Sequence, residues 1–271
     1  MRDLDSINGA AKSTKFVFTI ALAVPLFMGC GAWALAAGAA PNQALSENYL
    51  ALLGLGIAST AIIAIPIPYI FHWNWETKYF GAGILCLSSA AIIGIYPIFC
   101  IAQYSTLPII LRVALLFFEF GLIAQWCRRF LNIYKNIYLE KKLFHCIYIE
   151  EKNAVYYSQQ ADKKVIERLL KFKQFPPPKY FLLSGLMAFS LLPFATTLSQ
   201  FIGIPFIHIF LAAFSTPLNL MFLGLATRGW LIFYFYPMKI KSKTNKPVYI
   251  DMSSHPPECL MPQNHKRNAK L

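Results

Sequence analysis

The chain has 271 residues, of which 57% are hydrophobic, 15% aromatic and 14% charged, and its mean hydropathy is +0.49. This balance excludes an intrinsically disordered chain and argues against a soluble globular domain. The six cysteines have no paired spacing, which excludes a disulfide scaffold of the kind found in small secreted proteins. The composition therefore predicts an integral membrane protein.

Long apolar runs follow one another along the first half of the chain. A transmembrane helix needs about 20 mainly apolar residues to cross the hydrocarbon core of a bilayer. Together these runs predict a four-helix transmembrane part over residues 1–126. Four runs of sufficient length are present, and only the fourth contains charged side chains: 16–40, 49–71, 79–101 and 107–126.

The first apolar run also has features of a signal peptide. Lys12 and Lys15 precede it, and small residues at 37–39 resemble a cleavage site. Its length, however, exceeds the apolar stretch of about 7–15 residues that is usual in a signal sequence. The length favours an uncleaved helix, whereas cleavage would leave five spans.

A second apolar block covers residues 180–238 and contains one charge, Arg228. Turn-forming residues at 200–203 divide it into a fifth span over 180–199 and a remainder over 204–238. That remainder would be about 50 Å long as a single helix, which is more than one straight crossing requires. The block therefore holds two further transmembrane helices, and its length also allows a third.

Two interpretations of the remainder stay open. In the first, a sixth span over about 204–226 precedes an interfacial aromatic stretch over 230–236. In the second, residues up to Phe214 form a re-entrant piece and the span follows it.

The distribution of lysine and arginine predicts the orientation. Residues 1–15 hold three of them, the segment 127–179 holds twelve, and the tail from residue 239 holds seven. Basic loops tend to remain in the cytoplasm, so six spans with cytoplasmic N- and C-termini place every basic segment on the preferred side. A seventh span would export the basic tail. The sequence thus predicts an all-α membrane protein, a polytopic bundle of about six transmembrane helices. The opposite loops hold no lysine or arginine: 41–48, 102–106 and 200–203.

The basic segment 127–179 is predicted to be cytoplasmic, and its 53 residues are too few for a well-filled independent core. Apolar residues at helical spacing in 128–143 predict that the fourth helix continues past the bilayer. The β-favouring runs 144–149 and 155–157 predict a short hairpin.

The pattern over residues 162–175 indicates an amphipathic helix with one apolar stripe. Such a helix either lies on the membrane surface or a partner, or presents a solvated face while it packs on its own bundle. Prolines at 176–178 form a stiff boundary before the fifth span. The proline-containing basic tail over 239–271 is predicted to be disordered and cytoplasmic. Residues expected to contact the membrane surface or a partner are Lys163, Lys164, Arg168, Lys171 and Lys173.

Four polar residues within the apolar runs are candidates for function. Arg112 and Glu119 are seven residues apart, which places them on one helix face with Cα atoms about 10 Å apart. They can lean toward each other or meet partners on other helices. Either they serve as an ion relay or a substrate counter-ion, or they fix helix packing. His208 and Asn219 either line a path with Glu119 or bond to neighbouring helices. Arg228 is expected to mark the cytoplasmic edge.

Small residues in the first three apolar runs predict that these helices approach one another closely through their backbones. The residues concerned are Gly29, Gly31, Ala34 and Gly38, Gly54 with Ala58, and Gly81 with Gly83.

No catalytic motif, metal-ligand spacing or cofactor motif is found. The net charge of +13 is explained by loops that face anionic lipid, so no nucleic-acid partner is expected. We expect a non-enzymatic, multi-pass protein of the bacterial inner membrane that contacts lipid and binds another membrane protein. An accessory subunit of a secretion or conjugation machine and an immunity protein against a membrane-acting toxin both fit. Two alternatives are a small-solute or ion transporter or channel that uses Arg112 and Glu119, and a membrane lipid-modifying enzyme. The sequence leaves the oligomeric state open.

Overall fold

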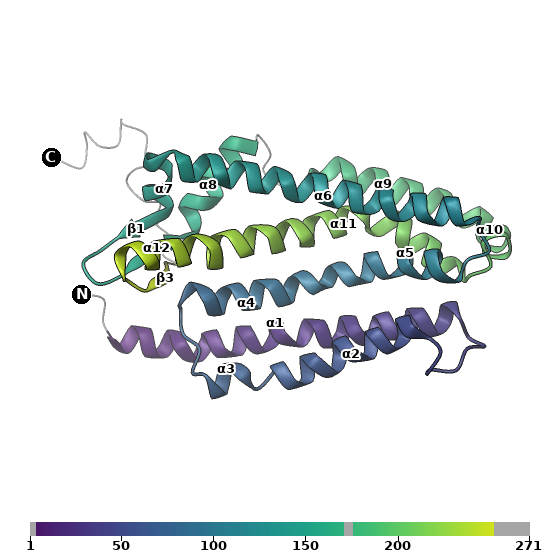
Figure 1. Cartoon of the computed structure of the whole chain (residues 1–271), viewed down its shortest axis with the longest axis horizontal. Coiled ribbons are helices and arrows are strands. Elements are labelled where there is room, and N and C mark those ends of the chain that lie inside the picture. Colours follow the sequence, from purple (N-terminus) through teal and green to yellow (C-terminus); the bar gives the residue numbers. More distant parts are fainter. Residues whose placement is uncertain (1–3, 171–175, 252–271) are drawn as a thin grey trace.

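The computed structural model describes residues 4–170 and 176–251 (Figure 1). Within these ranges, six helical stretches are long and apolar enough to cross a membrane. The prediction of a multi-pass α-helical membrane protein with about six spans is therefore confirmed. The candidate spans are Lys15–Ala39, Tyr49–Ile70, Thr77–Tyr104, Ile109–Leu139, Pro178–Ile202 and Phe206–Thr244.

Several spans are built from more than one helical segment, because prolines and short 3₁₀ turns interrupt them. The first and fourth spans are the uninterrupted helices α1 (Leu4–Ala39) and α6 (Ile109–Leu139). The second consists of α2 (Tyr49–Ala64) and α3 (Ile67–Ile70), and the third of α4 (Thr77–Ser88), η1 (Ser89–Ala91) and α5 (Ile92–Tyr104). The fifth consists of α9 (Pro178–Ser190), η2 (Leu192–Phe194) and α10 (Ala195–Ile202), and the sixth of α11 (Phe206–Trp230), the π-helical turn η3 (Leu231–Phe235) and α12 (Tyr236–Thr244).

The sixth span is longer than either interpretation of the sequence gave it. Residues Phe206–Thr244 form a continuous helical stretch of 39 residues, about 58 Å long, which exceeds the thickness of the hydrocarbon core. The helix runs without a break through Phe214, so no re-entrant piece precedes the span. Leu231, Phe233 and Tyr236, from the aromatic stretch, are buried against the basic segment 127–179, hereafter the polar segment.

Helices α1 and α2 lie side by side with their backbones in contact (Figure 1). A Cβ atom added at Gly29 would lie 2.5 Å from the backbone nitrogen of Ala58, and one added at Gly54 would lie 2.5 Å from that of Trp33. The predicted close approach is confirmed at these glycines. A Cβ atom at Gly31 or Gly38 would meet nothing within 4 Å, so these two residues do not contribute to it.

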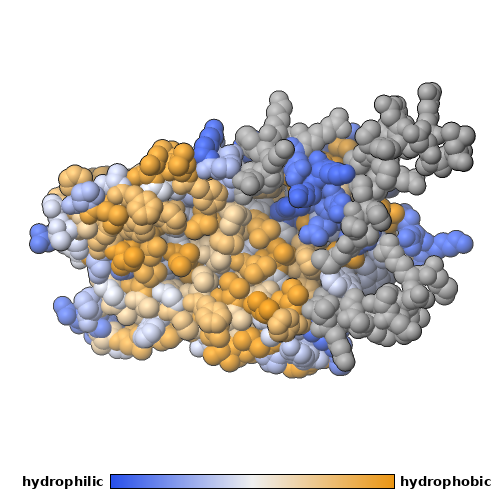
Figure 2. All heavy atoms as spheres, turned by 180° about the vertical axis from the view of Figure 1, so that it is seen from behind, coloured by the Kyte–Doolittle hydropathy of each residue, from blue (hydrophilic) through white to orange (hydrophobic). Residues whose placement is uncertain are grey.

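Helix α11 occupies the centre of the bundle and packs against α4, α5, α6 and α9 (Figure 1). The outer helices expose large apolar side chains such as Ile63, Phe117 and Leu183. Figure 2 shows this hydrophobic surface over most of one face, with hydrophilic residues gathered mainly at the end that carries the polar segment. Such a belt is what a lipid-facing surface requires.

The polar segment folds at one end of the bundle. It contains the helices α7 (Lys141–Ile147) and α8 (Gln159–Leu170) and the strands β1 (Tyr148–Glu150) and β2 (Val155–Ser158). Strands β1 and β2 pair in antiparallel fashion, which confirms the predicted hairpin. Helix α6 reaches Leu139, which confirms that the fourth helix continues beyond the apolar run.

The beginning of the tail is ordered, so the prediction of disorder from residue 239 is wrong for residues 239–251. Helix α12 extends to Thr244, and strand β3 (Val248–Asp251) pairs in parallel with β2 to complete a three-stranded sheet. Val248 and Ile250 are buried at alternate positions of the strand. Their burial stabilises an ordered strand, although the composition of the tail favours disorder. Residues 252–271 lie outside the described ranges.

One hydrophobic core joins the polar segment to the ends of α6, α11 and α12. The segment is therefore not an independent domain, since it completes its core with side chains from two spans. Figure 1 shows this folded end beside the beginning of α1, so the start of the N-terminal helix lies at the same end of the molecule as the described parts of the basic segments. The core includes Trp126, Phe130, Tyr134, Ile147, Tyr157, Val165, Ile166, Phe233, Tyr236 and Ile240.

Candidate functional site

Glu119 lies inside the bundle and is 3% exposed. Its Oε1 accepts a hydrogen bond of 2.7 Å from Nδ2 of Asn219, and its Oε2 accepts one of 3.4 Å from Oγ1 of Thr216. Asn219 is fully buried, and its Oδ1 has no hydrogen-bond partner among the described residues. Gly94 of α5 makes room for this amide, since a Cβ atom there would lie 2.1 Å from Oδ1. Helices α5, α6 and α11 thus meet around a carboxamide and a carboxyl group.

Arg112 does not pair with Glu119. Its Nη1 donates to the carbonyl oxygen of Ala102 in α5 at 3.3 Å, and its Nε is buried without a hydrogen-bond partner in the described part of the chain. The sequence left two arrangements open, and the second is observed: Arg112 and Glu119 each bond to a different neighbouring helix.

His208 ties α11 to α1. Its side chain is buried, with Nε2 2.9 Å from the carbonyl oxygen of Leu35 and Nδ1 3.2 Å from that of Pro205. Both ring nitrogens thus face carbonyl oxygens, and which of them donates depends on the tautomer. Asn219 lies about 16 Å further along the helix. The structure therefore brings Glu119 and Asn219 together and places Arg112 and His208 apart from them.

A second polar cluster lies where α11 enters the folded polar end. Nη2 of Arg228 lies 2.5 Å from Oδ2 of Asp162, and Nε of Arg228 donates to the hydroxyl of Tyr134 at 3.0 Å. The hydroxyls of Tyr134 and Tyr157 donate to the Asp162 carboxylate, the latter at 2.7 Å. We call these four residues the Asp162 cluster. It links α6, β2, α8 and α11, and Asp162 is fully buried.

Sequence reasoning missed the Asp162 cluster, because its ion pair joins residues 66 positions apart. Arg228 was expected only to mark the edge of the membrane. One signal was present, since Asp162 precedes Val165 and Ile166 by three and four residues and so lies on the apolar stripe of its helix. An acidic residue on a buried stripe requires a partner.

Two buried tyrosines of the polar end, Tyr148 and Tyr157, are held in the protonated form. Burial raises the pKa of Tyr157 well above its usual value of 10, and the negative charge of Asp162 raises it further. Burial likewise raises the pKa of Tyr148, whose hydroxyl donates to the carbonyl oxygen of Ile232 at 2.7 Å. Both hydroxyls therefore remain hydrogen-bond donors at neutral pH.

The basic residues of α8 border a polar pocket of about 510 Å³. Lys163 and Lys164 are exposed, and Nζ of Lys163 lies 4.0 Å from Oε1 of Glu167. Of the other residues predicted to contact membrane or partner, the side chain of Arg168 and the whole of Lys171 and Lys173 lie outside the described residues. The polar pocket is lined by Gln159, Gln160, Lys163, Lys164, Glu167 and Arg228.

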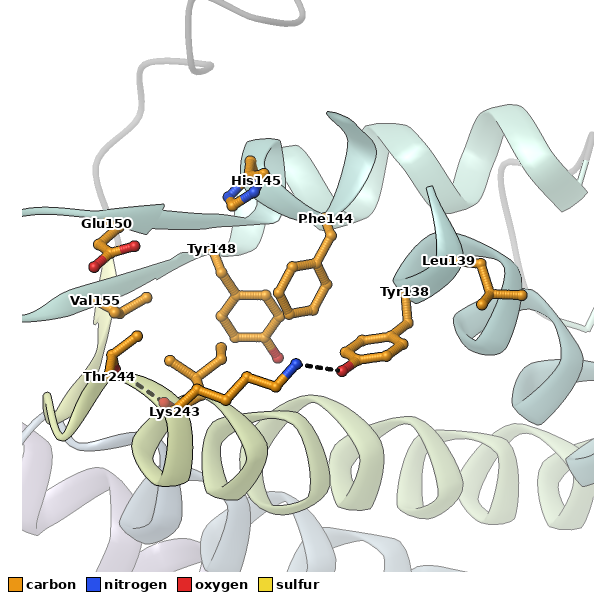
Figure 3. Close-up of a pocket in the computed structure, with 10 residues that line it drawn as sticks. Tyr138, Leu139, Phe144, His145, Tyr148, Glu150, Val155, Lys243 and Thr244 are labelled. Atoms are coloured by element: carbon orange, nitrogen blue, oxygen red, sulfur yellow. Dashed lines mark hydrogen bonds between the residues drawn. The ribbon is translucent and has the colours of Figure 1, made fainter. Parts of the chain in front are cut away.

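An aromatic pocket of about 500 Å³ opens at the same end of the molecule (Figure 3). Figure 3 shows the rings of Phe144, Tyr148 and Tyr138 around the space, with the Lys243 side chain extending toward Tyr138. Nζ of Lys243 donates to the Tyr138 hydroxyl at 3.4 Å. The pocket lining comes from five elements, which explains why no local motif indicated it. Its residues are Tyr138, Leu139, Phe144, His145, Tyr148, Glu150, Val155, Ile240, Lys243 and Thr244.

Charge at the rim of the aromatic pocket is predominantly positive. Glu150 is paired with Lys246, whose Nζ lies 2.6 Å from Oε1, and this hydrogen bond lowers the pKa of the Glu150 carboxyl. Lys239 does not line the pocket, but its Nζ lies over the ring of Tyr138, which does, 4.9 Å from the ring centroid. With the carboxylate neutralised by Lys246, Lys239 and Lys243 leave a cationic edge beside an aromatic wall.

These features define a multi-pass α-helical membrane protein with a folded, basic end that completes its core with its own spans. Comparison with models of protein families, with curated proteins and with solved structures finds no match. Among the described residues, no group of three or more histidine, cysteine, aspartate or glutamate side chains is placed to hold a metal ion.

Proposed function

We propose that this chain is a protein of the bacterial inner membrane that acts by binding another membrane protein through its basic end. An accessory subunit of a secretion or conjugation machine and an immunity protein against a membrane-acting toxin are the two forms of this proposal. The observation that carries it is the aromatic pocket with its cationic edge.

The aromatic pocket has the properties of a protein-binding site. Its walls are fixed, since the Tyr138 ring stacks on Tyr236 with centroids 5.2 Å apart and Phe144 lies 4.9 Å from Tyr148. Fixed aromatic walls lose little conformational entropy on binding, and buried aromatic anchors dominate the energy of many interfaces. The cationic edge favours a partner that inserts an apolar side chain next to an acidic residue.

The polar groups within the spans support a structural role for these residues. Glu119, His208 and Arg112 each bond to a different helix, at separate places in the bundle. Buried polar groups of this kind join helices in a membrane. One observation favours transport as a second candidate function: Oδ1 of Asn219, which has no hydrogen-bond partner among the residues that the structure describes, lies beside an ionisable carboxyl group.

The orientation follows from the same charge distribution. We infer that the basic end faces the cytoplasm, because the described parts of the basic segments gather there while the short loops of the opposite end lack lysine and arginine. A reporter inserted at Asn153, in the turn between β1 and β2, is expected to be cytoplasmic, and one inserted at Asn42 is expected to be external. An exported Asn153 reporter would contradict the inference.

Site-specific crosslinking in native membranes tests the proposed binding. A photoreactive amino acid at Leu139, which lines the aromatic pocket and is 68% exposed, is expected to form a discrete adduct with one protein. The same amino acid at Phe117, which is 75% exposed within the apolar part of α6, is the control and is expected to contact lipid.

Charge-reversal variants show which part of the surface the partner contacts. Lys243→Glu is expected to reduce the Leu139 adduct about fivefold or more, as the loss of a partly exposed charge contact of about 1 kcal/mol implies. Lys241→Glu, on the same helix but outside the aromatic pocket, is expected to leave the adduct unchanged. Equal adducts from Leu139 and Phe117, or an adduct that is insensitive to Lys243→Glu, would refute the proposal.

A further inference from the structure

We propose that the polar pocket between α8 and α11 binds a phosphate group, carried either by the head group of an anionic lipid or by a soluble phosphate ester. This inference concerns a different surface from the aromatic pocket and does not depend on the proposed partner.

The lining of the polar pocket is suited to an anion. Lys163, Lys164 and Arg228 contribute three cations, against the single carboxylate of Glu167. Asp162 offsets part of the Arg228 charge, but it is fully buried behind the guanidinium and contributes no exposed oxygen. Two glutamine side chains, Gln159 and Gln160, add amide donors to the same cavity.

Arg228 is held in place before any ligand binds. Its Nε and Nη2 are fixed by Tyr134 and Asp162, and Asp162 is in turn fixed by the hydroxyl of Tyr157. A guanidinium that is already oriented loses little side-chain entropy when it bonds to phosphate oxygens. Lys163 and Lys164 lie on the exposed face of α8 and supply mobile point charges beside it.

The depth of the pocket matches the head-group region of a bilayer. Arg228 follows an apolar stretch of α11 that begins at Phe206, and Trp230, two residues further on, is 51% exposed. Tyr180, at the beginning of α9, is 43% exposed. Exposed tryptophan and tyrosine side chains at the ends of spans are typical of the membrane–water interface. Basic pockets at this level between helices are suited to phosphate-bearing head groups.

Thermal unfolding of the purified full-length protein in a non-ionic detergent tests the proposal. Dioleoylphosphatidylglycerol is expected to raise the unfolding midpoint by a few degrees, whereas dioleoylglycerol, which lacks the phosphate, is not. A third arm compares inorganic phosphate with chloride at equal ionic strength. Stabilisation by the lipid alone assigns the phosphate to a head group, and stabilisation by inorganic phosphate as well assigns it to soluble phosphate esters too.

Paired lysine variants show whether the effect arises in the polar pocket. The double substitution Lys163→Gln and Lys164→Gln, at exposed positions that leave the fold intact, is expected to abolish the shift. The matched control, Lys142→Gln and Lys152→Gln, removes two exposed lysines outside the pocket and is expected to retain it. If neither phosphate source raises the midpoint, or if both double variants respond like the wild type, the polar pocket is not a phosphate site.

Discussion

Replacement of Arg228 by methionine is expected to cost about 3–5 kcal/mol of unfolding free energy, because it leaves a buried carboxylate without its counter-ion. Asp162 is fully buried and cannot turn toward water, so among the described residues its charge would keep the hydroxyls of Tyr134 and Tyr157 as its partners. The loss should also loosen the polar end from α11, because the Asp162 cluster joins them.

A second substitution, at Asp162, tests whether the destabilisation comes from the unpaired charge of the carboxylate or from the loss of the Arg228 side chain itself. Asp162→Asn in the Arg228→Met background removes the stranded charge and keeps an oxygen that accepts from Tyr134 and Tyr157. This double variant is expected to recover a large part of the lost stability, measured by thermal or chemical unfolding in detergent. A double variant no more stable than Arg228→Met would show that the ion pair is not what holds this junction.

Gly29→Ala and Gly54→Ala are expected to destabilise the contact between α1 and α2 by about 1–3 kcal/mol each, as overpacking does in a filled interior. In both cases the new methyl group would lie 2.5 Å from a backbone nitrogen of the facing helix, which no side-chain rotation can relieve. Whole helices must move apart, and the effect should appear as a lower unfolding midpoint and a lower level in membranes.

The same two helices provide matched controls for the glycine variants. Gly31→Ala and Gly56→Ala place a methyl group where nothing lies within 4 Å, and these changes are expected to be neutral or slightly stabilising. Equal loss of stability in all four variants would mean that helix flexibility, and not close packing, accounts for the glycines.

Local and periodic features of this protein could be predicted from its sequence. Six spans follow from run length and hydropathy, and the hairpin follows from two β-favouring runs around a polar turn. The extension of α6 beyond the apolar run follows from apolar residues at helical spacing. In each case the signal lies within about 30 residues of chain.

Features that depend on distant partners could not be predicted. The pairing of β3 with β2 brings Val248 beside Val155, and the proline and lysine content around β3 concealed its short alternating pattern. The sixth helix continues beyond the apolar core of the bundle because its last turns pack in a hydrophobic core shared with the polar segment. Hydropathy alone does not distinguish residues of such a core from residues at a membrane interface. The ion pair of Asp162 with Arg228 is visible only once α8 is placed against α11.

Glu119→Gln distinguishes most directly between function at the basic end and function within the spans. Glutamine retains an oxygen that accepts from Asn219, so the helices should remain joined, but it cannot ionise. The measurement is complementation of a strain that lacks the chain, with Glu119→Gln and Lys243→Glu variants matched for membrane level and unfolding midpoint. Binding at the basic end predicts that Glu119→Gln restores the wild-type phenotype and that Lys243→Glu does not. The reverse, a stable Glu119→Gln protein that fails while Lys243→Glu complements, would contradict partner binding and support transport through Glu119.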